Sequence, residues 1–124
     1  MVEIDDLFGH EPLPAGFVSE LRKYYEEARS AGRYDFESGR RLAGAARAIG
    51  FEILHERVLE DDEFSFNGAA PPEVLEAWRA RLQRMPGLKN SLGPNFAVFK
   101  EAFLETLSSS NHCSRTRVVL VIAQ

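Results

Sequence analysis

The sequence predicts an α/β fold: a small mixed three-stranded sheet flanked by about four helices, in a single domain that spans residues 1–124. Three observations support this prediction. Short β-branched segments occur at both ends and in the middle of the chain, amphipathic segments separate them, and the resulting order is β-α-α-β-α-α-β. Hydrophobic residues make up 44% and charged residues 27% of the chain, which is the balance of an ordinary globular domain.

The N-terminal segment has the character of a strand end followed by a loop. Residues 1–4 are short and partly β-branched, and residues 5–14 contain one glycine and two prolines. Apolar residues then recur at helical spacing from 17 to about 31, while charged residues fill the opposite face. This pattern predicts an amphipathic helix that ends near Gly32.

The next unit is a helix that leads directly into a strand. The apolar stripe predicts a helix over 38–49, with Ser38 as its N-cap and Gly50 in the left-handed conformation after its last turn. Residues 51–59 follow without room for a long loop, and their composition predicts a strand. Residues 64–66 either extend this strand or form a separate short one.

The C-terminal half of the chain predicts two helices and a final strand. Prolines open a helix over 72–85, and Asn95 is placed to cap a helix over 95–107. Residues 108–114 are a polar linker. The apolar run at 117–123 has no polar alternation, so we expect helices or loops to cover both faces of this strand.

Composition and charge exclude several classes of protein. The net charge of −4 gives no electrostatic reason to expect nucleic-acid binding, and the longest apolar run is too short to cross a membrane. The single cysteine, Cys113, excludes an internal disulfide, and the acidic N-terminus does not have the pattern of a secretory signal. The sequence therefore predicts a cytoplasmic protein that contacts neither nucleic acid nor membrane.

Three segments together resemble the C-terminal half of a class I S-adenosylmethionine (SAM)-dependent methyltransferase. Residues 2–6 resemble the end of that fold's fifth strand, and residues 41–54 resemble the following helix and its Gly-Phe turn into the sixth strand. Residues 117–123 resemble the seventh strand, which lies antiparallel between the other two. The resemblance implies a partial Rossmann-like fold in which residues 12–34 and 64–110 are insertions that cap the substrate.

The same resemblance implies that these residues do not include the cofactor-binding half. That half carries a glycine-rich turn after its first strand, where backbone N–H groups approach the ligand. No two of the nine glycines here are separated by a single residue, so the chain has no G-x-G motif. We expect no cofactor on this chain alone and SAM only if an N-terminal half completes it. The expected partner is that separate N-terminal half or, because the first strand has a free edge, a second copy. Alternatively, the chain is a truncated piece of a longer enzyme.

Candidate site residues lie just beyond the first strand. Ligands bind at the carboxyl ends of strands in open α/β sheets, so Asp5 and Asp6 are candidates for binding the substrate. His10 is the candidate catalytic general base, because imidazole titrates near neutral pH. The alternative is a solvated loop whose aspartates only form turns.

Aromatic residues supply the other candidates for substrate binding. Tyr34 lies in a loop from which its hydroxyl could reach a substrate, and Trp78 and Phe99 lie on two helices that could cover a pocket. The alternative for these helices is that their aromatic faces pack on each other. His112 and Cys113 are read as parts of a plain loop, because no metal-ligand spacing surrounds them.

The sequence thus predicts the substrate-binding half of a SAM-dependent methyltransferase that acts on a small molecule and is inactive alone. One alternative is a non-enzymatic, methyltransferase-like binding or regulatory module that self-associates. Another is a helical interaction protein, in which the predicted strands would not form.

Overall fold

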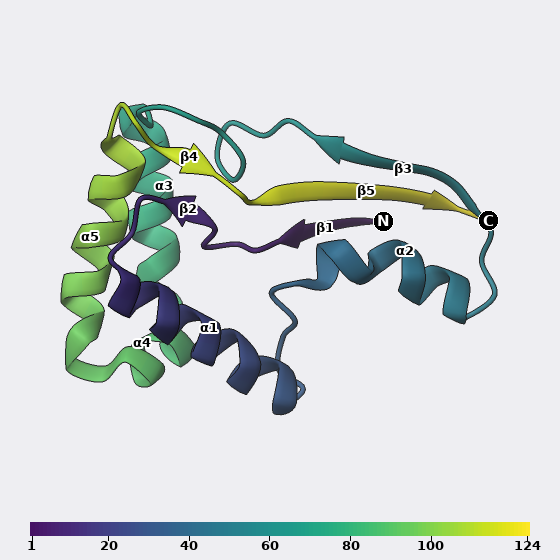
Figure 1. Ribbon diagram of the computed structural model, residues 1–124, viewed down its shortest axis with the longest axis horizontal. Coiled ribbons are helices and arrows are strands. Elements are labelled where there is room, and N and C mark those ends of the chain that lie inside the picture. Colours follow the sequence, from purple (N-terminus) through teal and green to yellow (C-terminus); the bar gives the residue numbers. More distant parts are fainter.

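The computed structural model describes all 124 residues as a mixed α/β fold (Figure 1). Its elements are β1 (Val2–Asp5), β2 (His10–Glu11), α1 (Ala15–Ser30), α2 (Ser38–Ala48), β3 (Ile53–Leu59), α3 (Pro72–Gln83), α4 (Pro86–Leu92), a 3-10 turn (Gly93–Asn95), α5 (Phe96–Ser108), β4 (Cys113–Ser114) and β5 (Arg117–Ala123). The α/β class and the order of the predicted elements are confirmed. Two features were not predicted: helix α4, and the two-stranded pairing of β2 with β4.

The main sheet has the strand order β1-β5-β3, as predicted. Residue Ile4 lies opposite Val118, and Val58 lies opposite Val119, so β5 is antiparallel to both neighbours. The prediction of a mixed sheet was wrong in this respect: β1 and β3 run in the same direction but do not touch, and every pairing is antiparallel. Both outer edges of this sheet are unpaired, including the edge of β1 that we expected to be free.

Helix α2 covers only one face of the main sheet (Figure 1). Ala43 of α2 packs with Val119 and Val121 of β5 in a cluster of three buried residues, and the small alanine side chain lets the helix lie close to the strand. On the opposite face, Val2 is 54% exposed and Ile122 is 44% exposed. The prediction that both faces of residues 117–123 would be covered therefore holds at Val118, which is buried on this second face, and fails at Ile122.

The main hydrophobic core lies among the helices rather than on the sheet. It contains 15 buried residues, and all except Phe8 and Phe36 come from the segments 12–34 and 64–110. Helix α1 contacts α4, and α3 contacts α5, so the two segments form one helical layer beside the sheet (Figure 1). None of these helices combines the length and the apolar character that crossing a membrane requires.

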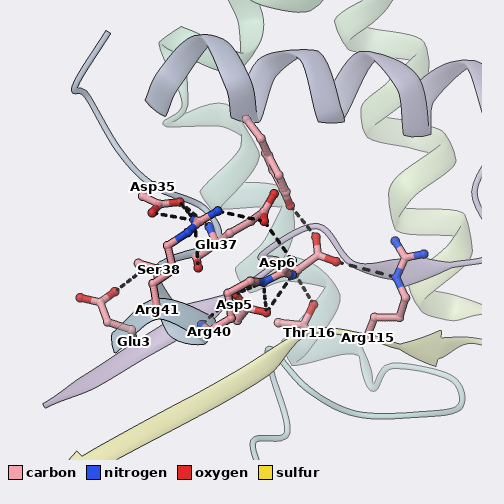
Figure 2. Close-up of polar contacts among 11 residues, drawn as sticks. Glu3, Asp5, Asp6, Asp35, Glu37, Ser38, Arg40, Arg41, Arg115 and Thr116 are labelled. Carbon is pink, nitrogen blue, oxygen red and sulfur yellow. Dashed lines mark hydrogen bonds and ion pairs between the residues drawn. The ribbon is translucent and has the colours of Figure 1, made fainter. Parts of the chain in front are cut away.

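Helix α2 begins differently from the prediction. Ser38 is its first residue, not its N-cap, and no side chain at the cap position bonds to the helix. The hydroxyl of Ser38 donates to Glu3 at 2.9 Å, while the carboxylate of Asp5 accepts the backbone N–H of Arg40 at 3.1 Å (Figure 2). The end of β1 thus supplies the cap that the sequence pattern assigned to Ser38.

Two other predicted cap positions have different outcomes. Gly50 has a positive φ of 98°, which confirms the predicted left-handed residue after α2. Asn95 occupies the cap position of α5, but its side chain makes no capping hydrogen bond. A 3-10 turn precedes this helix and continues directly into it, so the first turn needs no separate cap.

Truncation of the core aromatic Phe103 should cost more stability than any surface change on the same helix. Phe103 is fully buried against Phe8, Trp78 and Phe99. We expect Phe103→Ala to lower the free energy of unfolding by about 3–5 kcal/mol, measured by urea denaturation followed by circular dichroism. The control is Val98→Ala, at a position that is 63% exposed, which should change it by less than about 0.5 kcal/mol. Equal losses in the two variants would contradict this location of the core.

Candidate functional site

A cavity of about 490 Å³ lies beyond the carboxyl end of β1, where the sequence placed the substrate. We call it the β1-end cavity. Helix α1 forms one wall through Val18, Leu21, Arg22 and Tyr25, and the start of α2 contributes Glu37 and Arg40. The remaining lining residues come from two loops and the short strands: Asp6, Phe8, His10, Glu11, Pro12, Leu13, Asn111, Cys113 and Arg115. Segment 12–34 therefore lines one side of this cavity, whereas segment 64–110 contributes no residue to it.

Asp6, the first residue after β1, has a strained backbone. Its φ is +57°, and it is the only residue other than glycine with a positive φ. Backbone hydrogen bonds fix it there: its N–H donates to the carbonyl of Phe36 at 2.8 Å, and its carbonyl accepts the Gly9 N–H at 2.9 Å. The hydroxyl of Thr116 also donates to this carbonyl, at 2.7 Å. A non-glycine residue held in this conformation indicates a constraint that the surrounding structure imposes.

The side chain of Asp6 takes part in a polar network at the cavity wall (Figure 2). Its Oδ1 accepts the hydroxyl of Tyr25 at 2.9 Å, and its Oδ2 lies 3.8 Å from Nε of Arg115. The same Tyr25 oxygen accepts the backbone N–H of Phe8 at 2.9 Å. Burial, and then the negative charge of Asp6, raise the pKa of Tyr25, so its hydroxyl stays protonated and keeps donating to Asp6.

His10 forms a buried pair with His112. His10 is 1% exposed, and its Nδ1 lies 2.8 Å from Nε2 of His112, whose Nδ1 lies 2.8 Å from the carbonyl of Gly68. A carbonyl only accepts, so Nδ1 of His112 carries the proton, its neutral Nε2 accepts, and His10 donates from Nδ1. A neutral His10 with its one proton on Nδ1 has an unprotonated Nε2. The nearby hydroxyl of Thr116 does not donate to this nitrogen, because it already donates to Asp6.

The environment of His10 opposes protonation. Burial, then the adjacent His112 imidazole, and then the charge of Arg115, lower the pKa of His10 to about 3. A base whose conjugate acid is this strong takes up a proton poorly at neutral pH. The geometry therefore favours a neutral, hydrogen-bonding His10 at the cavity wall over the general base that we expected from sequence.

The other predicted site residues lie outside the β1-end cavity. Asp5 is 2% exposed and is bound by Arg40, behind the wall. Trp78 and Phe99 are fully buried in the main core, where the indole N–H of Trp78 donates to the carbonyl of Glu63 at 2.8 Å. Tyr34 is exposed and packs edge-on against Phe36. Of the six candidates, the structure brings only Asp6 and His10 to the cavity.

Sequence reasoning missed the three arginines of the cavity and the partner of His10. Arg22 lies three residues before Tyr25 on α1, a spacing that puts both side chains on one helical face, so this arginine was detectable in principle. Arg115 and His112 reach the site only because β4 pairs with β2, and nothing in the local sequence indicated that two-residue pairing. The acids Asp6, Glu11 and Glu37 balance the three arginines across the cavity.

The residues present do not fit SAM, and no metal site is visible. Two glycines lie close to other atoms, but the neighbours belong to the chain itself. A Cβ on Gly9 would lie 2.6 Å from the carboxylate of Asp6, and one on Gly39 would lie 2.6 Å from Cβ of Asp5. These glycines allow the chain to pack on itself and do not form a cradle for a nucleoside. No group of three or more His, Cys, Asp or Glu side chains is placed to hold a metal ion.

No protein-family model, curated protein or solved structure matches this chain. The interpretation of the β1-end cavity therefore rests on its geometry and chemistry.

The strain at Asp6 can be measured by comparing two substitutions. Both Asp6→Gly and Asp6→Ala remove the carboxylate, but only glycine adopts a positive φ without a steric cost. We expect Asp6→Gly to be more stable than Asp6→Ala by about 1 kcal/mol in urea denaturation. The opposite order would show that the backbone is not held in this conformation in solution.

Acid should destabilise the protein through His10. The unfolded chain binds a proton near pH 6.5 and the folded chain only near pH 3, so stability is lost as the pH falls below about 6.5. Wild-type protein should lose up to about 1.4 kcal/mol per pH unit more than His10→Asn, in which the amide can still donate to His112. Parallel curves of unfolding free energy against pH for the two proteins would contradict the buried neutral pair.

Proposed function

We propose that residues 1–124 form the acceptor-binding half of a SAM-dependent methyltransferase that acts on a small molecule. The observation that carries this proposal is the arrangement of the main sheet. Strand β5, the last in the sequence, lies antiparallel between β1 and β3, which run in the same direction. A cavity opens where β1 ends. This is the arrangement that the resemblance to class I methyltransferases implies for their last three strands.

The strand arrangement is informative because it departs from the simplest connectivity. Consecutive strands usually lie side by side, and a hairpin-connected sheet would place β3 beside β1. Here α2 carries the chain across one face of the sheet and leaves a gap that β5 later fills. Fold alone does not establish function, so the proposal also depends on the chemistry at the cavity.

Asp6 is the residue best placed to bind an acceptor. Tyr25 occupies Oδ1, and Arg115 stands 3.8 Å from Oδ2, so the carboxylate keeps lone pairs free to accept from a hydroxyl or amine. His10 also lines this wall, but its side chain is buried and its Nε2 lies 3.4 Å from the hydroxyl of Thr116. The apolar side chains of Val18 and Leu21 supply a surface from which water is excluded.

The cofactor must be bound outside residues 1–124, on a separate chain or on another part of a longer polypeptide. Because no residue here fits SAM, we assign no step of methyl transfer to this chain beyond binding and orienting the acceptor. The unpaired edge of β1 and the uncovered face around Val2 and Ile122 are surfaces on which a complementary half can rest. A cytoplasmic location suits the exposed thiol of Cys113.

The purified chain should not bind SAM. Calorimetric titration of SAM into the chain should give no saturable heat, because the sequence has no G-x-G turn whose backbone N–H groups could approach a nucleotide. S-adenosylhomocysteine serves as a second probe of the same site. Binding of either molecule in a one-to-one ratio would show that the chain has a cofactor site of its own and would overturn the division into halves.

Methyl transfer itself can be tested by depletion and restoration. An extract of the native host, depleted of this chain with an antibody, is incubated with tritiated SAM and small-molecule metabolites. Adding wild-type chain should restore label in a small-molecule product, and Asp6→Asn, which loses the charged acceptor of the hydrogen bond, should restore about tenfold less or lower still. Asp62→Asn, an exposed acid outside the cavity, is the matched control. Label that is independent of the chain, or equal for wild type and Asp6→Asn, would contradict the proposal.

A further inference from the structure

A second hollow of about 630 Å³ adjoins the β1-end cavity and has a different chemical character. We call it the arginine hollow. None of its nine lining residues is hydrophobic, and it shares Asp6, Arg22, Arg40 and Arg115 with the cavity. Its other lining residues are Asp5, Ser65, Ser114, Thr116 and Arg117. The shared side chains, from α1, α2 and the loops at the end of β1 and before β5, place the two spaces next to each other.

The arginine hollow is positively charged in an acidic protein. Four arginines and two aspartates line it, which gives a formal charge of +2, whereas the whole chain has a net charge of −4. Charge that opposes the sign of the whole molecule and gathers in one concave surface concentrates ligands of the other sign. This surface therefore favours anions.

Internal ion pairs neutralise only part of this charge. Arg40 binds the buried carboxylate of Asp5 with three side-chain contacts of 3.0–3.2 Å and also pairs with Glu37 at 2.9 Å, so its charge is neutralised (Figure 2). Arg115 contacts Glu11 at 2.6 Å and Asp6 at 3.8 Å, and its side chain is 55% exposed. It thus stays accessible at the boundary between the hollow and the cavity.

Arg22 and Arg117 have no partner of their own. Neither makes an ion pair with any acid of the chain, although both line the hollow. Ser114 adds a hydroxyl that accepts from the backbone N–H of Thr116 and keeps its own proton free to donate. Two unpaired guanidinium groups and one free hydroxyl therefore line a single concave wall.

We infer that the arginine hollow binds an oxyanion, a carboxylate or a phosphate carried by the small-molecule acceptor. The guanidinium group presents parallel N–H donors that match two oxygens of either anion. An acceptor whose anionic group is bound by Arg22 and Arg117 would extend its remaining part into the β1-end cavity, towards Asp6. That the anion belongs to a methyl acceptor depends on the proposed function. Binding of the anion itself requires only this chain.

The test is titration of the purified chain with inorganic phosphate and, separately, with acetate. Binding is followed by two-dimensional NMR of the backbone amides at constant ionic strength, with chloride as the reference anion. We expect saturable shifts at residues 114–117, and about tenfold weaker binding in Arg22→Gln and in Arg117→Gln. Arg117→Lys should recover part of the affinity, because it restores the charge without the paired donors. The anion that binds more tightly identifies the class of acceptor.

The matched control is Arg84→Gln, at an exposed arginine that makes no ion pair and lies outside both spaces. It should bind phosphate as wild type does. Shifts that do not saturate, or equal losses in Arg84→Gln and Arg117→Gln, would overturn the inference, since a general charge effect would then explain them. Saturable binding that is lost in Arg22→Gln and Arg117→Gln, without any methyl transfer, would uphold the anion site and reject the proposed function. Methyl transfer to a neutral acceptor that Arg22→Gln and Arg117→Gln leave unchanged would uphold the proposed function and reject the anion site.

Discussion

The buried carboxylate of Asp5 determines how helix α2 fits against the main sheet. It ends β1, is almost fully shielded from water, and receives both the guanidinium and a backbone N–H of Arg40 at the start of α2. Helix α2 can approach this closely because Gly39 has no side chain to meet Asp5. A buried charge without partners is very costly, so this contact fixes α2 against the sheet, and α2 in turn determines where β3 begins.

The two acids at the end of β1 have different roles because the backbone turns sharply between them. Asp5 points towards α2, where its carboxylate binds Arg40 and has a structural role. Asp6, with its positive φ, lines the β1-end cavity. Tyr25 of α1 binds the carboxylate of Asp6, and Thr116, in the link between β4 and β5, binds its backbone carbonyl. A cavity in which Tyr25 orients the carboxylate and hydrogen bonds fix the backbone behind it is preorganised for a ligand, at the expense of backbone strain at one residue.

Periodicity predicted the long elements and their order, because each helix and strand has its own repeating pattern of apolar residues. It also identified Asp6, which directly follows a strand. It did not predict the location of Trp78 and Phe99, since a buried aromatic stripe looks the same whether it covers a pocket or fills a core. The pairing of His10 with His112 depends on two residues of β2 meeting two of β4, and contacts between such short and distant segments leave no periodic signal.

The unequal size of the two cores sets where the protein opens most easily. Fifteen buried residues hold the helical layer together, whereas only three lie between α2 and β5. Separating α2 from the strands exposes little apolar surface and leaves the aromatic residues undisturbed, so the contact of Asp5 with Arg40 is what chiefly resists it. The sheet end can therefore rearrange to accommodate a neighbouring surface while the wall formed by α1 keeps its shape. Assembly with another polypeptide would therefore draw mainly on contacts at the sheet end, whereas binding of a small ligand would draw on the wall formed by α1.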